Sequence, residues 1–140
     1  MKMRQYKLDN WTCLEDDRLE IVTLCGIRDK ITGEWIVPYK YTAISPFSEG
    51  LSSVEKDGLW GFINREGEEV VPCIYDDAGD FHCGLAIVEK NHSWGYINSY
   101  GKTILPFVYE QGSASFYDGL ATVVQRGERY VINLKGERIV

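Results

Sequence analysis

Four residues with zinc-binding side chains lie close together in this sequence: Cys73, His82, Cys83 and His92. Structural zinc sites need four convergent ligands, usually arranged as two closely spaced pairs. His82 and Cys83 are adjacent, and adjacent side chains on an extended strand point to opposite faces. The spacing therefore disfavours a metal site, and we expect neither a metal nor another cofactor.

A second group of reactive side chains is acidic. The segment 47–80 has nine acidic residues against only Lys56 and Arg65, while the whole chain has a net charge of −6. Six of these acids are candidates for a face that binds a basic protein partner: Glu66, Glu68, Glu69, Asp76, Asp77 and Asp80. A loose divalent-cation site and a solvated face that keeps the protein soluble are the alternatives. Because binding to phosphates needs clustered Lys and Arg, we expect no nucleic acid partner.

Two tryptophans, Trp60 and Trp94, have the aromatic faces needed to stack on a sugar or a peptide. They recur at one position of a repeated pattern, however, which favours packing between repeats over ligand binding. If they are buried there, Trp94→Ala should cost about 3 to 5 kcal/mol of stability.

The sequence shows no nucleophile paired with a base, no phosphate-binding glycine loop and no zinc-protease helix, so we predict that the protein is not an enzyme.

These groups must be positioned by a repeated unit. The pattern F-x-x-G-L-[SA]-x-V begins at Phe47, Phe81 and Phe116, a spacing of 34 or 35 residues. Such self-similarity is typical of repeat proteins, in which each unit is too small to bury its own apolar face. We predict a single repeat domain over 1–140. Its parts are an N-terminal cap, a degenerate repeat and three recognisable repeats, with bounds 1–17, 18–46, 47–80, 81–115 and 116–140.

Two turn signals in each copy separate short strand-like runs. Asp57-Gly58 suits a tight hairpin, and the Asn-x-x-Gly signal at 64–67 suits a second turn of four residues. Pro72 and Pro106 lack an N–H group, so strand pairing is expected to end at them. The predicted fold class is all-β, with antiparallel hairpins and three-stranded meanders stacked in an open, solenoid-like array.

The run Trp60-Gly61-Phe62-Ile63 explains why the units should stack. Side chains alternate along a strand, so this run is apolar on both faces and needs cover from both sides. Gly61 has no side chain and leaves room for another chain to approach closely. We therefore expect each unit to be wedged between its neighbours.

The recurring residues resemble the signature of the bacterial WG-repeat family. They are Trp60, Gly61, Gly67, Pro72 and Tyr75 in one copy, and Trp94, Gly95, Gly101, Pro106 and Tyr109 in the next. The resemblance implies an all-β tandem array, mostly of uncharacterised function, without a known common active site. The sequence departs from the pattern where Arg129-Tyr130 replaces Trp-Gly and where Cys25 replaces Trp.

We expect a non-catalytic module that binds a protein partner. The alternative is a module that binds glycans or peptidoglycan fragments through exposed aromatic residues; buried tryptophans favour the first and a solvent-facing row of aromatics the second. The sequence has no apolar stretch of signal-peptide or membrane-span length, so we expect a cytoplasmic protein without a membrane partner. Partner identity and oligomeric state are left open by the sequence.

Overall fold

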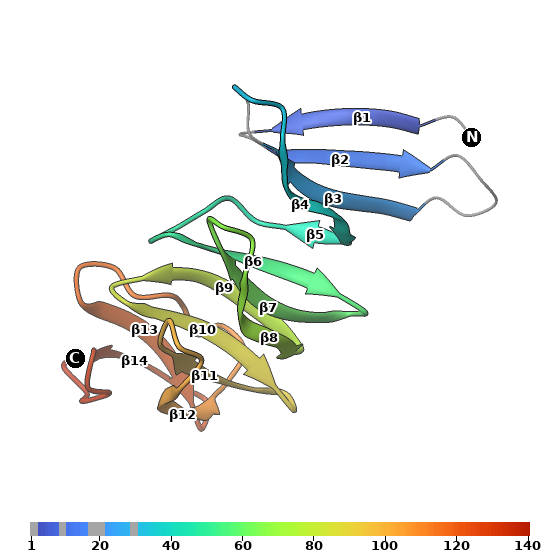
Figure 1. Cartoon of the computed structure of the whole chain (residues 1–140). Helices are drawn as coiled ribbons and strands as arrows, with labels where there is room; N and C mark the ends of the chain where they lie inside the picture. Colours follow the sequence, from blue (N-terminus) through green and yellow to red (C-terminus); the bar gives the residue numbers. More distant parts are fainter. Residues whose placement is uncertain (1–2, 9–10, 17–21, 29–30) are drawn as a thin grey trace.

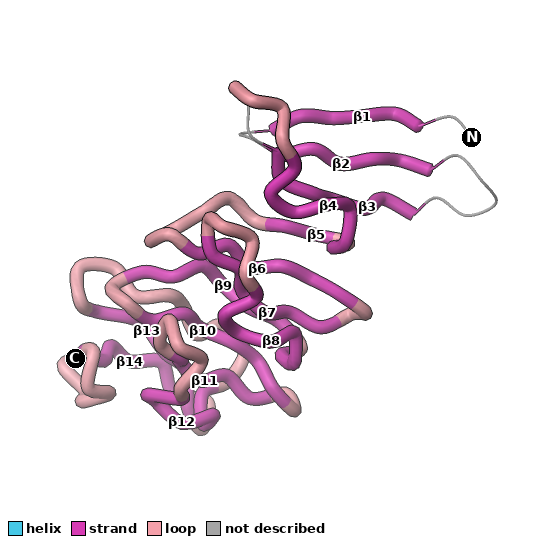
Figure 2. The backbone as a smooth tube through the Cα atoms, viewed as in Figure 1, coloured by secondary structure: helices cyan, strands magenta, loops and turns pink. Residues whose placement is uncertain are grey.

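The computed structural model describes residues 3–8, 11–16, 22–28 and 31–140. The predicted cap (1–17) and degenerate repeat (18–46) are therefore described only in part, because residues 1–2, 9–10, 17–21 and 29–30 lie outside the described residues. All regular elements of the described chain are β-strands (Figure 2). No helix among the described residues is long and apolar enough to cross a membrane. The predicted all-β class is confirmed.

The strands form four antiparallel sheets in chain order, which we label A to D. Sheet A contains β1 (Met3–Leu8), β2 (Trp11–Asp16), β3 (Val22–Arg28) and β4 (Trp35–Tyr41). Sheet B contains β5 (Ala43–Ile44), β6 (Leu51–Lys56), β7 (Leu59–Asn64) and β8 (Glu69–Tyr75). Sheet C contains β9 (Asp77–His82), β10 (Leu85–Lys90), β11 (Ser93–Ile97) and β12 (Thr103–Tyr109), and sheet D contains β13 (Leu120–Gln125) and β14 (Glu128–Asn133).

The sheets follow one another in an open row (Figure 1). Strand β1 lies at one end of the row and β14 at the other, as expected for an array that does not close. The described parts of the predicted cap are not a separate element, because β1 and β2 pair with β3 inside sheet A.

Sheets B and C have four strands rather than three. The segments that follow Tyr41 and Tyr75 form the first strands of the next sheets: β5 pairs with β6, and β9 pairs with β10. The sheets therefore begin at Ala43 and Asp77, whereas the predicted copies begin at Phe47 and Phe81. The period is the same, but the structural unit starts a few residues earlier than the sequence pattern.

The prolines do not end strand pairing, so that prediction was wrong. In sheet B, Val71 pairs with Phe62 and Tyr75 pairs with Trp60, with a register shift between them. Pro72 lies inside β8 at this β-bulge, where a missing N–H removes no required ladder bond. The same shift separates Leu105 from Tyr109 in β12 and Val37 from Tyr41 in β4.

The bulge explains the glycine of the Trp-Gly pair. A Cβ atom on Gly61 would lie 2.4 Å from the carbonyl oxygen of Val71 and 2.7 Å from the amide nitrogen of Cys73. On Gly95 it would lie 2.9 Å from the carbonyl oxygen of Leu105. The prediction that this glycine admits a closely approaching chain is confirmed, and the chain is the bulged fourth strand of the same sheet.

Sheets B and C pack on both faces, as predicted for a wedged unit. Ile63 belongs to the core between sheets A and B with Tyr41 and Val54, whereas its neighbour Phe62 belongs to the core between sheets B and C. Strand β11 alternates in the same way, with Ile97 facing sheet B and Tyr96 facing sheet D. The cores are therefore seams between consecutive sheets.

Candidate functional site

The six predicted acids lie on several consecutive elements of sheets B and C. Glu66 and Glu68 lie in the turn before β8, Glu69 begins β8, Asp76 lies between β8 and β9, and Asp77 and Asp80 lie on β9. Several of them bind the protein's own backbone or side chains. Glu68 accepts a hydrogen bond from the Asn64 amide nitrogen at 2.9 Å, and Asp76 accepts one from the Asn91 amide at 3.0 Å. Asp77 accepts a bond from the Ala78 amide at 2.8 Å.

An exposed apolar stripe runs along the fourth strands of sheets B and C. Its members are Val70, Pro72 and Ile74 on β8, and Ile104, Pro106 and Val108 on β12. The four aliphatic side chains are 37% to 42% exposed, while Val71, Tyr75, Leu105 and Tyr109 between them are buried. Both strands are sheet edges, and no other described strand pairs with their free sides. Figure 1 shows β8 and β12 at the lower edges of their sheets.

The acids stand at both ends of the β8 half of the stripe. Glu66 and Glu68 precede it and Asp76 and Asp77 follow it, whereas the β12 half is preceded by Lys102 and followed by Glu110. The site therefore combines an apolar centre with an acidic rim in sheet B. Sequence reasoning missed the stripe, although the alternation Val-x-Pro-x-Ile and Ile-x-Pro-x-Val in the two copies was a visible signal.

A cluster of titratable groups lies behind the stripe, in the seam between sheets A and B. One oxygen of Glu69, Oε1, accepts hydrogen bonds from the Cys73 thiol at 3.1 Å and the Tyr41 hydroxyl at 3.5 Å. The Lys56 ammonium lies 3.4 Å from the same oxygen. Burial by itself would raise the pKa of Glu69, but the bonds from Cys73 and Lys56 lower that pKa below its usual value. Glu69 is therefore an internal acceptor, unlike the rim acids.

The thiol in this cluster is held protonated. Burial, and then its hydrogen bond to Glu69, raise the pKa of Cys73 from an ordinary value of 9.0 to about 12. Burial and the charge of Glu69 raise the pKa of Tyr41 to about 12 as well. Because the thiolate is the nucleophilic form of cysteine, Cys73 is unsuited to nucleophilic catalysis near neutral pH.

These raised values predict a loss of stability in alkali. The folded state keeps protons that the unfolded chain releases, so the stabilisation is fully present below pH 9 and is lost as pH rises from about 9 toward 12. Urea melts between pH 7 and pH 10.5 should show a steeper decline for the wild type than for Cys73→Ala. The difference should be on the order of 1 kcal/mol at pH 10.

Cys83→Ala is the matched control for this measurement, because Cys83 is an exposed cysteine outside the cluster. It should follow the wild-type decline. Equal slopes for the wild type and Cys73→Ala would show that the Cys73 thiol titrates normally in the folded protein.

The two tryptophans are only half-buried, so the prediction that they fill the seams needs correction. Trp94 packs at the margin of the core between sheets C and D, and its Nε1 donates a hydrogen bond to Gln111 at 3.3 Å. The second aromatic of each copy, Phe62 or Tyr96, fills the seam and is fully buried. Trp60 and Trp94 lie opposite Tyr75 and Tyr109, the last residues of the bulged strands.

His82 and Cys83, two of the four residues considered as zinc ligands, make other contacts. His82 stacks on Tyr117 with ring centroids 4.7 Å apart, and Cys83 Sγ accepts a hydrogen bond from the Gly119 amide at 3.4 Å. Within the part of the chain that the structure describes, no three His, Cys, Asp or Glu side chains converge as metal ligands.

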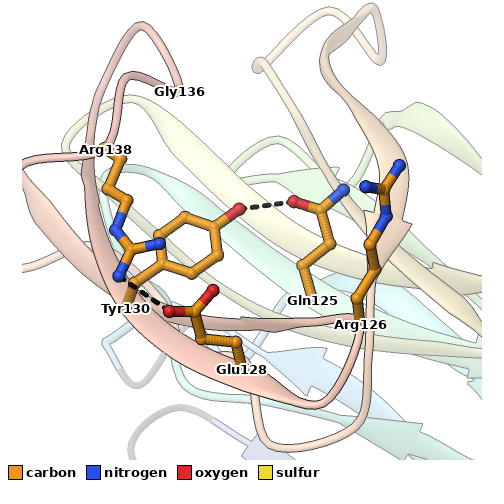
Figure 3. A pocket seen from close by; sticks show the side chains of 6 residues that line it. All are labelled: Gln125, Arg126, Glu128, Tyr130, Gly136 and Arg138. Carbon is orange, nitrogen blue, oxygen red and sulfur yellow. Dashed lines mark hydrogen bonds and ion pairs between the residues drawn. The ribbon is translucent and has the colours of Figure 1, made fainter.

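A polar pocket of about 320 Å³ lies on sheet D where the sequence departs from Trp-Gly (Figure 3). Arg138 donates a hydrogen bond to Glu128 at 2.9 Å and lies 4.7 Å from the centre of the Tyr130 ring, while the Tyr130 hydroxyl donates to Gln125. The bond from Arg138 lowers the pKa of Glu128. These groups satisfy one another. The pocket contains no nucleophile paired with a base.

Comparison with known proteins agrees with this architecture. No curated protein matches the chain. A family profile described as "WG containing repeat" matches it three times, over residues 29–60, 60–91 and 94–128. The matched residues include β4 of sheet A and β13 of sheet D, and they contain both the glycine and the bulged strand of sheet C. The chain therefore belongs to the WG-containing-repeat family.

Proposed function

We propose that this WG-repeat protein is a non-catalytic module that binds a protein partner on the apolar stripe. The observation that supports the proposal is the repetition of one outward apolar triplet on the edge strands of two consecutive sheets. Edge strands of soluble proteins usually carry charged residues or are covered, because exposed apolar edges invite association. Exposed apolar patches on folded proteins commonly mark interaction sites.

The rim suggests the chemistry of the partner. Apolar side chains of the partner would cover Val70, Ile74, Ile104 and Val108, and basic side chains would approach the acids at the ends of β8. Complementary charge mainly raises the association rate and selects the partner, while apolar burial supplies affinity. The preferred partner is a protein segment that is both apolar and basic.

A glycan-binding function has less support. Sugar stacking needs aromatic faces arranged together, but the most exposed tyrosines, Tyr100 and Tyr117, lie in turns on different sheets. Tyr117 is stacked on His82, and the indole nitrogen of Trp94 is bonded to Gln111. The described aromatic residues therefore do not offer a continuous platform.

Affinity capture with stripe variants tests the proposal. The double variant Ile74→Ser, Val108→Ser should lose at least tenfold in the capture of partners from an extract of the native cell, because both halves of the stripe lose apolar area. Leu134→Ser is the matched control: Leu134 is 39% exposed but lies in the turn after β14, off the stripe. It should capture the same proteins as the wild type. The melting temperatures of the double variant and of Leu134→Ser must stay close to that of the wild type.

The acidic rim is tested separately with the partner so identified. Changing Glu66, Glu68, Asp76 and Asp77 to their amides, with Glu69 retained for the internal cluster, should weaken binding at low salt and flatten its salt dependence. Charge attraction between exposed groups is screened over about 8 Å at physiological ionic strength. Full binding by the stripe variant, or selective binding of peptidoglycan fragments by the wild type, would contradict a protein-binding stripe.

A further inference from the structure

Two cysteines occupy directly opposite positions on neighbouring strands of sheet A. In the antiparallel pair of β2 with β3, Cys13 is the register partner of Cys25, and the register runs without a shift from Trp11 to Asp16 (Figure 1). Directly opposite residues belong to the same face of an antiparallel sheet, because successive residues alternate between faces on both strands. The backbone therefore brings the two cysteines together on one face of sheet A.

The backbone spacing at such a pair suits a disulfide. Cα atoms of directly opposite residues in antiparallel strands are about 4.5 or 5.5 Å apart, depending on whether the two residues exchange backbone hydrogen bonds. Disulfides usually join Cα atoms that are about 4.4 to 6.8 Å apart. Either kind of pair therefore allows the bond without separating β2 from β3.

The equivalent positions in sheets B and C hold a different pair of residues. Cys25 is opposite Tyr41 of the fourth strand, as the tryptophan is opposite the fourth-strand tyrosine in sheets B and C. On the preceding strand, that tryptophan is opposite Glu55 in sheet B and Glu89 in sheet C. These glutamates and tryptophans are half-buried, so the position reaches solvent in both sheets. In sheet A both members of the pair are cysteine, a change that the repeat itself does not require.

We propose that Cys13 and Cys25 are a redox-active pair that forms a cross-strand disulfide by exchange with a small-molecule disulfide such as glutathione disulfide. One cysteine, as its thiolate, attacks a glutathione sulfur and releases one glutathione thiolate, which leaves a mixed disulfide. The second cysteine thiolate attacks the protein sulfur of that mixed disulfide and releases the second glutathione. The two protein thiols lose two electrons and two protons, which reduce glutathione disulfide to two glutathione thiols.

The bond would tie β2 to β3 and stabilise the first seam of the array. A disulfide restricts the unfolded chain, so its closure stabilises the sheet that contains it. Sheet A contributes Tyr41 to the core that it shares with Val54 and Ile63 of sheet B. Because the exchange is reversible, the ratio of glutathione disulfide to glutathione sets which form dominates. The pair is separate from the stripe on β8 and β12 and does not depend on the proposed function.

Mass spectrometry of the purified protein after oxidation tests the proposal. Trypsin cleaves at Arg18 between the two cysteines, which places Cys13 on peptide 8–18 and Cys25 on peptide 19–28. After incubation of the folded protein with glutathione disulfide and alkylation of the remaining thiols, these two peptides should be joined. Alkylation of both should fall at least about tenfold relative to the reduced protein, because the second thiol attacks from within the same chain. An excess of reduced glutathione should reverse the link.

Cys83→Ala is the matched control, because Cys83 is an exposed cysteine in the turn between β9 and β10. It should give the same joined peptides, whereas Cys25→Ser should give none. Thiols at 13 and 25 that stay open to alkylation, or that carry separate glutathiones, would overturn the proposal, as would a link from either one to Cys73 or Cys83. An equal yield of the joined peptides in concentrated urea would also overturn it, because the register of β2 and β3 would then not be what brings the cysteines together.

Discussion

Replacing Gly61 with alanine should destabilise the protein by about 3 kcal/mol or more, the upper part of the range for overpacked interiors. The added methyl group would meet the backbone of Val71, Pro72 and Cys73 at 2.4 to 2.7 Å. Backbone atoms of a paired strand cannot move aside as a flexible side chain can, so the bulge must be displaced or the pairing of β7 with β8 lost. Urea melts followed by tryptophan fluorescence would measure the change.

Alanine substitutions at two other glycines should cost less stability, and they are comparisons for this prediction. Gly95→Ala should cost less, about 1 to 3 kcal/mol, because its closest contacts are one carbonyl oxygen at 2.9 Å and the ring of Phe107, which can shift. Gly58→Ala meets nothing within 4 Å and should cost about 1 to 2 kcal/mol, from the strain of a side chain at a φ of +80°. A loss below about 1 kcal/mol for Gly61→Ala would show that the bulge yields easily.

Tyr96→Ala should cost about 3 to 5 kcal/mol, the usual range for truncating a buried large aromatic. Tyr96 is fully buried between sheets C and D, with ring centroids 5.0 Å from Phe116 and 5.8 Å from Tyr109. Its hydroxyl donates a hydrogen bond to the Ala114 carbonyl at 2.5 Å. The truncation therefore opens a cavity in a seam and leaves that carbonyl without its donor.

Trp94→Ala, which the sequence alone predicted to be the costly change, should cost only about 1 to 2 kcal/mol, because Trp94 is half-buried at the margin of the same core. Chemical denaturation of both variants, followed by far-ultraviolet circular dichroism, compares them without depending on the tryptophan signal. If Trp94→Ala proved as costly as Tyr96→Ala, the indole rather than the second aromatic would be the main anchor of the seam.

Several features of the fold were predictable because they depend on neighbouring residues. The hairpin at Asp57-Gly58 has positive φ at both residues, 55° and 80°, as the tight turn requires. The need for cover on both faces of β7 followed from alternation along one strand, and the glycine after tryptophan was explained by its lack of a side chain. Membership of the repeat family could likewise be expected, because the period is visible in the spacing of Phe47, Phe81 and Phe116.

The candidate site was harder to predict because exposure depends on what lies across the sheet. The acids at 66–80 are close in sequence, but a turn, a strand edge and a new strand separate them, and three of them bind nearby groups in the protein. The stripe consists of residues that look like core, and Val70 differs from the buried Val71 only in the side of β8 on which it lies.

The sequence by itself determined the all-β class, the repeat period, the turns and the position of the close approach at Gly61, because each depends on local backbone chemistry or on spacing along the chain. Only the tertiary structure decided that Pro72 lies within a bulged strand, that Phe62 and Tyr96 rather than the tryptophans fill the seams, and that Leu120 is exposed where Leu51 and Leu85 are buried. Pairing across a bulge and burial in a seam depend on the neighbouring strand and sheet. Identical residues in successive repeats therefore have different surroundings.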